Sequence, residues 1–260
     1  MKSTVCTLAA LALIPASALA AGAFDGTWKV SLDHIQLSKK PFAFVLAGGQ
    51  FTCSTCAPAY TIKADGTDQK VSGHTGFDTE SITIVDAHTV KTTDKLKGKM
   101  INVNTDTISA DGTTDTVESV DYTGTQPSTV KVLMTRVSGG DPGSHALSGS
   151  WLDSKVLSLD GPGYTTTFGI TDDGLTMSSN GQAYDAKFDG KKYPVTGDPT
   201  NTKVVLKKLA ADEVQESDYQ QGKLISVGHY KVSADGKTIH ASNTTIATHR
   251  TIHWTMNKVS

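Results

Sequence analysis

GKMINVNTDTISADG, residues 98–112, is the stretch that decides the fold, because it occurs again as GKLISVGHYKVSADG, residues 222–236. Outward from it, residues 59–112 align with residues 183–236 at a constant offset of 124 positions and without a gap. Self-similarity at a fixed spacing is typical of a duplicated structural unit. Turn glycines and strand valines recur, whereas most residues capable of chemistry do not. The two copies therefore share a scaffold.

The repeated segments have the pattern of β-strands joined by tight turns. Apolar and polar residues alternate with a period of two, which is typical of half-buried strands. Such runs occupy residues 28–32, 81–84, 100–108, 130–137 and 252–256. Asp-Gly pairs between runs supply the positive φ angles of hairpin turns. Because no helical stretch is strong enough to form crossovers, we predict an all-β fold of two tandem antiparallel β-barrels.

A small, polar stretch separates the two copies. Residues 138–144, Ser-Gly-Gly-Asp-Pro-Gly-Ser, contain too few apolar side chains to pack. The predicted division is therefore a first barrel at residues 24–137, a linker at 138–146 and a second barrel at 147–260. Each part is long enough to bury its own core, so we expect each to fold alone.

The start of the chain has the pattern of a secretory signal peptide. Lys2 precedes an apolar run at residues 5–14, and small residues end in Ala18-Leu19-Ala20. We predict a signal peptide over residues 1–20 and a periplasmic or secreted protein after its cleavage. No later segment approaches the roughly 18 to 20 continuous apolar residues of a membrane helix, so no membrane span is expected.

Charge argues against one class of partner. The chain has 24 Lys and Arg against 26 Asp and Glu, a formal net charge of −2. An electrostatic nucleic-acid binder needs a clustered basic face, and no basic cluster occurs in the sequence. Nucleic acid is therefore not an expected partner.

Each repeat opens with Gly-x-Trp and ends with a strand that places Met and then a basic residue on one face. These signature residues are Gly26, Trp28 and Arg136 in the first repeat and Gly149, Trp151 and Lys258 in the second. A tryptophan ring accepts a cation at about 0.5 to 2 kcal/mol, which offsets the cost of a charge at the end of an apolar face. We expect Trp28 to be buried against Arg136. Likewise, we expect Trp151 to be buried against Lys258.

Gly-x-Trp on the first strand with Arg or Lys on the last resembles the lipocalin and fatty-acid-binding (calycin) barrels. The chain as a whole resembles a group of uncharacterised secreted bacterial proteins with tandem lipocalin-like repeats. That resemblance rests on FDGTW at 24–28, FTCSTC at 51–56, YPVTGDP at 193–199 and the Ala-Asp-Gly hairpins. It implies barrels whose interiors hold a small apolar or amphipathic ligand.

Cys53 and Cys56 form the only local motif with chemistry of its own. A thioredoxin-type Cys-x-x-Cys begins a helix, but a strand precedes this pair and Pro58 follows it. A structural disulfide is the favoured interpretation for an exported protein, with redox activity and metal binding as alternatives. The aligned positions in the second copy are Met177 and Asn180, so the scaffold does not require the pair.

No catalytic set emerges from the remaining residues, and we predict no catalytic residue, metal site or cofactor. The sequence contains no Gly-x-Ser-x-Gly elbow, its histidines lack metal spacing, and we interpret its acidic residues mainly as turn residues because Asp-Gly pairs recur. The leading hypothesis is a ligand-binding exported protein. The alternatives are a structural or protein-interaction module of the cell envelope and a barrel-type enzyme with dispersed residues. An apolar cavity favours ligand binding, a packed interior favours the module, and titratable groups converging in a cavity favour the enzyme.

Overall fold

The computed structural model describes residues 22–260, so the predicted signal peptide lies outside the described residues. Over this range the chain forms twenty β-strands and one 3-10 turn, Pro162–Tyr164. None of the elements within residues 22–260 is a helix long and apolar enough to cross a membrane. The predicted all-β, antiparallel fold is confirmed.

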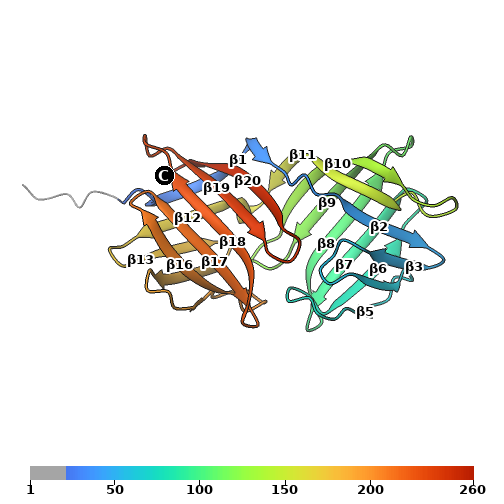
Figure 1. Cartoon of the computed structure of the whole chain (residues 1–260), viewed down its shortest axis with the longest axis horizontal. Coiled ribbons are helices and arrows are strands. Elements are labelled where there is room, and N and C mark those ends of the chain that lie inside the picture. Colours follow the sequence, from blue (N-terminus) through green and yellow to red (C-terminus); the bar gives the residue numbers. More distant parts are fainter. Residues whose placement is uncertain (1–21) are drawn as a thin grey trace, which may run out of the picture.

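The strands form two ten-stranded antiparallel sheets, each curled into a nearly closed barrel (Figure 1). In one sheet, called the first barrel, the strand order is β4-β3-β2-β11-β10-β9-β8-β7-β6-β5. Its strands are β2 (Phe42–Ala47), β3 (Gln50–Cys53), β4 (Tyr60–Lys63), β5 (Gln69–Lys70), β6 (Thr79–Ile84), β7 (Thr89–Leu96), β8 (Lys99–Ile108), β9 (Thr114–Asp121), β10 (Ser128–Gly139) and β11 (Gly149–Asp160).

In the other sheet, called the second barrel, the order is β14-β13-β12-β1-β20-β19-β18-β17-β16-β15. Its strands are β1 (Gly26–Gln36), β12 (Thr165–Ile170), β13 (Gly174–Ser179), β14 (Gln182–Lys187), β15 (Tyr193–Pro194), β16 (Lys203–Ala210), β17 (Glu213–Gln220), β18 (Lys223–Val232), β19 (Thr238–Thr245) and β20 (Arg250–Lys258).

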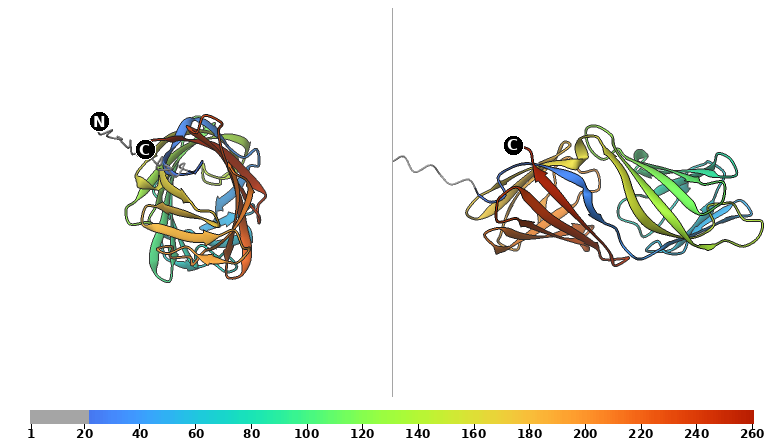
Figure 2. Two further views of the ribbon diagram at one scale, coloured as in Figure 1. Left: turned by 90° about the vertical axis from the view of Figure 1, so that its left-hand side faces the viewer. Right: turned by 90° about the horizontal axis from the view of Figure 1, so that it is seen from above.

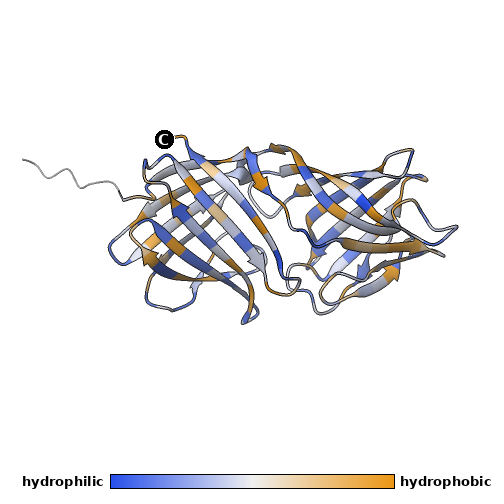
Figure 3. Ribbon diagram, turned by 45° about the horizontal axis from the view of Figure 1, so that its top comes forward, coloured by the Kyte–Doolittle hydropathy of each residue, from blue (hydrophilic) through white to orange (hydrophobic). Residues whose placement is uncertain are grey.

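Each barrel encloses its own apolar core. Hydrophobic and hydrophilic residues alternate along the strands (Figure 3), as half-buried strands require. The first core includes Leu46, Phe51, Ile82, Val90, Ile108, Met134, Leu147 and Trp151. The second includes Phe24, Trp28, Phe168, Leu175, Leu206, Val214, Ile239 and Met256.

The first strand of each repeat lies in the barrel built by the other repeat. Strand β1 pairs with β12 and β20, and β11 pairs with β10 and β2. Figure 2 shows β1 among the strands of the second repeat and the chain then crossing to the first barrel. The predicted division into residues 24–137 and 147–260 is therefore wrong. The predicted linker, 138–146, is also partly strand, because β10 continues to Gly139.

Loop length explains the exchange. Strands β10 and β11 are separated only by residues 140–148 and pair from Thr129 opposite Asp160 to Gly139 opposite Gly149. Closing so short a loop costs less chain entropy than bringing β10 back to β1 across most of a repeat. Since β1 and β11 begin with the same Gly-x-Trp motif, the motif alone does not assign either strand to a barrel. The nearer strand therefore completes the first barrel, and β1 completes the second.

The two signature tryptophans are fully buried, each beside a basic residue, but the predicted partners are exchanged. The guanidinium of Arg136 lies 4.0 Å from the Trp151 ring centroid, and the Lys258 ammonium lies 5.3 Å from that of Trp28. The expected pairs Trp28–Arg136 and Trp151–Lys258 are thus wrong, because each tryptophan travels with its exchanged strand. The kind of contact is as expected.

Glycine is needed where each exchanged strand begins. Gly26 and Gly149 have φ angles of 128° and 129°, a region that other residues rarely adopt. A Cβ at Gly26 would lie 2.3 Å from the Ser260 carbonyl oxygen, and one at Gly149 would lie 2.2 Å from that of Ser138. The Gly-x-Trp motif therefore combines a close backbone approach with a buried indole.

Arg136 does more in the first barrel than Lys258 does in the second. Its guanidinium donates hydrogen bonds to the carbonyl oxygens of Gly112, Ala146 (2.6 Å) and Ser148 (2.7 Å), besides covering the Trp151 ring. These carbonyls belong to the β8–β9 turn and the loop before β11. Arg136 thus fixes the exchanged strand to the barrel that receives it.

We predict that a fragment of residues 38–164, which holds β2 to β11, unfolds cooperatively on its own. A fragment of residues 24–137 should not, because it lacks β11 and leaves the facing edges of β2 and β10 unpaired. Circular dichroism during thermal denaturation of both fragments, with the full chain as reference, tests this. Absence of a cooperative transition in the 38–164 fragment would contradict the assignment of β11 to the first barrel.

Replacing each signature cation by methionine should separate the two contacts. Arg136→Met removes charged hydrogen bonds and a cation–π contact, so we expect a loss of about 2 to 4 kcal/mol of unfolding free energy. Lys258→Met loses mainly a contact of an exposed ammonium with the ring, so about 0.5 to 1 kcal/mol is expected. Urea denaturation measures both. Equal losses would rule out the anchoring role of Arg136.

Candidate functional site

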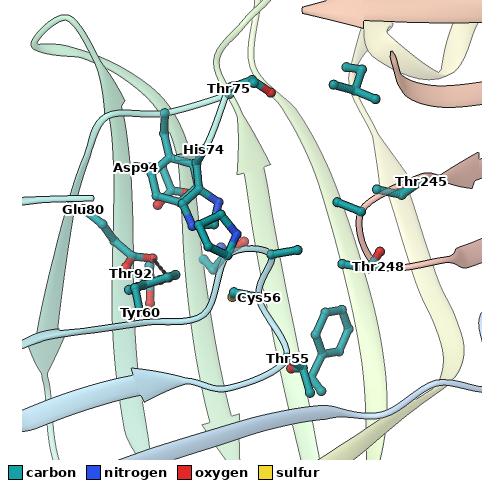
Figure 4. A pocket seen from close by; sticks show the side chains of 18 of the residues that line it. Thr55, Cys56, Tyr60, His74, Thr75, Glu80, Thr92, Asp94, Thr245 and Thr248 are labelled. Atoms are coloured by element: carbon teal, nitrogen blue, oxygen red, sulfur yellow. Dashed lines mark hydrogen bonds between the residues drawn. The ribbon is translucent and has the colours of Figure 1, made fainter. Parts of the chain in front are cut away.

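The first barrel contains a cavity of about 930 Å³. Its wall is formed from β2, β3, β4 and the barrel strands β6 to β10, and its far side by turns of the second barrel. Lys223 at the β17–β18 turn and Thr245 and Thr248 at the β19–β20 turn line that side. In Figure 4 the two threonines lie across the cavity from His74 and Tyr60. Both barrels therefore contribute to the site.

An ion pair fixes the second barrel against the cavity rim. Arg250 on β20 contacts Asp153 on β11 at 2.7 Å, with side-chain exposures of only 13% and 16%. The same guanidinium lies 3.6 Å from the ring centroid of Phe42. Phe42 and Asp153 both line the cavity. The rim is thus held by a largely desolvated contact rather than by an exposed surface pair.

Aromatic side chains form a continuous row along one wall. The aromatic row consists of Phe42, Phe44, Phe51, Tyr60, His74 and Phe77, and successive contacts join the rings. Phe44 and Phe51 are stacked at 5.7 Å between centroids, and His74 and Phe77 at 4.8 Å. The row gives the cavity a planar, apolar surface suited to flat ligand groups.

Two carboxyl groups face each other below this row. Glu80 on β6 pairs across the sheet with Asp94 on β7, and the Tyr60 hydroxyl donates a 2.9 Å hydrogen bond to Glu80 Oε1. Figure 4 shows that bond and the three side chains together. Burial, reinforced by the charge of Asp94, raises the pKa of Glu80 to about 8, and burial raises the pKa of Asp94 to about 6. The raised pKa values show that burial disfavours two negative charges side by side at this position.

A second acidic pair lies on the next strands. Asp106 on β8 lines the cavity, and Asp115 on β9 is completely buried behind it. Burial and the neighbouring Asp115 raise the pKa of Asp106 well above its usual range, while burial raises the pKa of Asp115 to about 6. Protonation of Asp106 lets the two carboxyls coexist in this apolar setting.

His74 belongs to the apolar wall rather than to the charged groups. Its ring stacks on Phe77 and meets Tyr60 edge-on at 5.3 Å. Burial lowers the pKa of His74, so the imidazole is neutral at pH 7. No group of three or more His, Cys, Asp or Glu residues in the range 22–260 is arranged to hold a metal ion.

Cys53 and Cys56 form the predicted disulfide, which closes the segment after β3. Cys53 is completely buried, and Cys56 lies on the cavity wall. The Cys56 amide also donates a 3.1 Å hydrogen bond to Cys53 Sγ. The bridge therefore shapes the part of the wall that carries the aromatic row from Phe51 to Tyr60.

The second barrel repeats the tyrosine and carboxyl arrangement. The Tyr184 hydroxyl donates to Glu216 Oε2, and Asp218 follows on the same face of β17. Tyr184 and Asp218 align with Tyr60 and Asp94, but Glu216 aligns with Thr92 rather than with Glu80. Burial and the nearby Asp218 raise the pKa of Glu216 to about 8. The glutamate of the second barrel therefore comes from the strand that also carries the aspartate, whereas in the first barrel the two acids lie on neighbouring strands.

Two substitutions between the repeats fill the second interior. Tyr230 stands where the first repeat has Asp106 at the offset of 124. Trp254 corresponds to Val132 when the last strands are aligned at Arg136 and Lys258, and the two residues pair with the preceding strand at Ala241 and Val117. The ring centroids of Phe168 and Tyr230 are 5.9 Å apart, and those of Tyr230 and Trp254 are 6.4 Å apart. Both side chains pack against the second core. Large rings thus occupy space that small or polar side chains leave free in the first barrel.

The buried acids were not predicted from the sequence, because the recurring Asp-Gly pairs favoured a turn interpretation for acidic residues. A signal was present: Glu80 alternates with Ile82 on β6, and Asp94 alternates with Val90 and Thr92 on β7. A carboxylate in phase with an apolar strand face is expected inside the barrel. The turn interpretation does hold for Asp111, which accepts hydrogen bonds from Ser109 and Thr113.

Comparison with known proteins adds no relative. No family model, curated protein or solved structure matches the chain. The calycin resemblance therefore stays a prediction from the signature residues, and the functional argument rests on the cavity.

We predict that stability falls as pH rises from about 5 to about 8. The pKa of Glu80 moves from 4.5 to about 8 on folding, so the folded state binds more protons in this window and loses stability as they leave. Glu80→Gln should make the decline measurably shallower without abolishing it, since burial also raises the pKa values of Glu216, Asp94, Asp106 and Asp115. Melting temperatures between pH 5 and pH 9 measure it. The exposed Glu118→Gln control should keep the wild-type slope, and a stability that rises with pH would contradict the prediction.

Proposed function

We propose that this chain is an exported protein that binds a small apolar or amphipathic ligand in the cavity of the first barrel. The single observation behind the proposal is the cavity of about 930 Å³ lined by the aromatic row. Ligand pockets usually measure about 300 to 1,000 Å³ and combine an apolar wall with a few polar groups. Tyr60, Glu80 and Asp94 supply such polar groups here.

Export is part of the proposal. It is supported by the predicted signal peptide over residues 1–20 and by the Cys53–Cys56 disulfide, which suits an oxidising compartment. The periplasm or the extracellular medium would then be where the ligand is met.

The cavity bears on both alternative functions, the interaction module and the barrel-type enzyme. An interaction module would be favoured by packed interiors, and only the second barrel has its interior filled at the positions of Tyr230 and Trp254. The enzyme alternative requires titratable groups that converge in a cavity, and Glu80, Asp94 and Asp106 meet that condition. A compound recovered from the protein in chemically altered form would favour the enzyme.

The test is to fill the cavity as the second repeat does. Val132→Trp introduces the residue found at the aligned position 254, on the cavity face of β10. The control Lys131→Trp adds the same ring to the neighbouring, exposed position of that strand. Both variants and the wild type should be isolated from the native compartment and extracted for mass spectrometry.

We expect the wild type and Lys131→Trp to carry the same compound, and Val132→Trp to carry at least about tenfold less at a similar melting temperature. Loss of space, rather than loss of fold, would then explain the difference. Extracts that do not differ between Val132→Trp and the wild type would refute the proposed function.

A further inference from the structure

Acidic side chains outnumber basic side chains around the cavity. Four carboxyl groups line the cavity, from Glu80, Asp94 and Asp106 on the wall and Asp153 on the rim, and no arginine does. Lys223 stands at the turn of the second barrel, and the only histidine on the wall is the half-buried His74, whose pKa is lowered by burial. Asp153 on the rim is already paired with Arg250. The deep acidic groups thus face the cavity without a basic side chain beside them.

Glu80 is the most telling of these groups. Its side chain is only 4% exposed, and it lines the cavity. Tyr60 donates to Oε1, whereas Oε2 and Asp94 Oδ1 receive no donor from a third residue among residues 22–260, so only a carboxyl proton held between Glu80 and Asp94 can bridge them. A buried acidic pair of this kind is costly, and an N–H group of a ligand would stabilise it by donating to its oxygens.

The surroundings of the pair select the kind of cation. Divalent metals require six or more oxygen ligands for calcium, or an octahedral set for magnesium, and the described residues form no such group. The aromatic row beside Glu80 instead provides a wall for a planar apolar body. Tyr60 connects the row to the acidic pair, because its ring contacts Phe51 and its hydroxyl donates to Glu80. Aromatic faces also attract organic cations.

We propose that the cavity takes a protonated organic amine with a planar apolar body, its ammonium group against Glu80 and Asp94 and its body against the aromatic row. This inference rests on the proposed function and names the ligand class. A protonated amine brings a positive charge to this acidic pair, which has no basic side chain beside it, and it can donate hydrogen bonds to both carboxyl groups.

Three probes with the same naphthyl body test the inference by calorimetric titration at pH 7. They are 2-(1-naphthyl)ethylamine, 2-(1-naphthyl)ethanol and 1-naphthylacetate, which differ in charge at one end. We expect the amine to bind about tenfold or more tightly than the alcohol, and the acetate to bind most weakly. The Glu80→Gln, Asp94→Asn double variant should reduce the preference for the amine to about twofold or less while leaving the affinity for the alcohol nearly unchanged.

The matched control is Glu216→Gln with Asp218→Asn, which makes the same changes in the second barrel and should keep the wild-type preference. If the first double variant does not fold, Asp94→Asn alone should still reduce the preference several-fold. Equal affinity for the amine and the alcohol in the wild type, or a preference that survives the Glu80 and Asp94 changes, would overturn the amine assignment and leave ligand binding standing. Failure of all three probes to bind would count against both proposals.

Discussion

Each barrel of this protein is completed by a strand from the other repeat, and the rest of the architecture depends on that pairing. The receiving barrel presents a last strand with a basic residue, and the arriving strand brings Gly-x-Trp. The tryptophan is buried completely, its indole N–H donates to a backbone carbonyl, and its ring receives the cation. Since neither repeat holds its own first strand, each barrel is built from a segment of chain that crosses the boundary between the repeats.

The exchange also places the two barrels so that one covers the cavity of the other. Strand β1 belongs to the second barrel, and the chain then passes directly into β2 of the first. Asp153 on strand β11 of the first barrel forms an ion pair with Arg250 on β20 of the second. The turns around Thr245 and Thr248 are thereby brought to the cavity wall. A simple tandem of independent barrels would not fix this arrangement.

Sequence patterns predicted the strands, the turns and the disulfide because these depend on neighbouring residues. The period-two alternation and the Asp-Gly turns at Asp111-Gly112 and Asp235-Gly236 are local, and both glycines have positive φ angles. The exchange could not be predicted in the same way, because Gly26-Thr27-Trp28 and Gly149-Ser150-Trp151 are nearly equivalent motifs. Only loop length distinguished the two pairings, and the loop of residues 140–148 was interpreted as a separator. The candidate site depends on long-range closure, so Glu80 and Asp94 met Tyr60 only in the folded barrel.

The two barrels each bury a cluster of acidic groups, but their interiors differ in how much space surrounds it. Both keep a tyrosine that donates to a glutamate beside an aspartate, and burial raises the pKa of both glutamates. In the second barrel Tyr230 and Trp254 add bulk to the core, whereas in the first Asp106 and Val132 leave space next to the acidic pair. A buried acidic cluster is costly in either setting. Its survival in the filled barrel shows that the scaffold tolerates it, so the distinguishing property of the first barrel is that its acidic pair faces a cavity that a ligand can occupy.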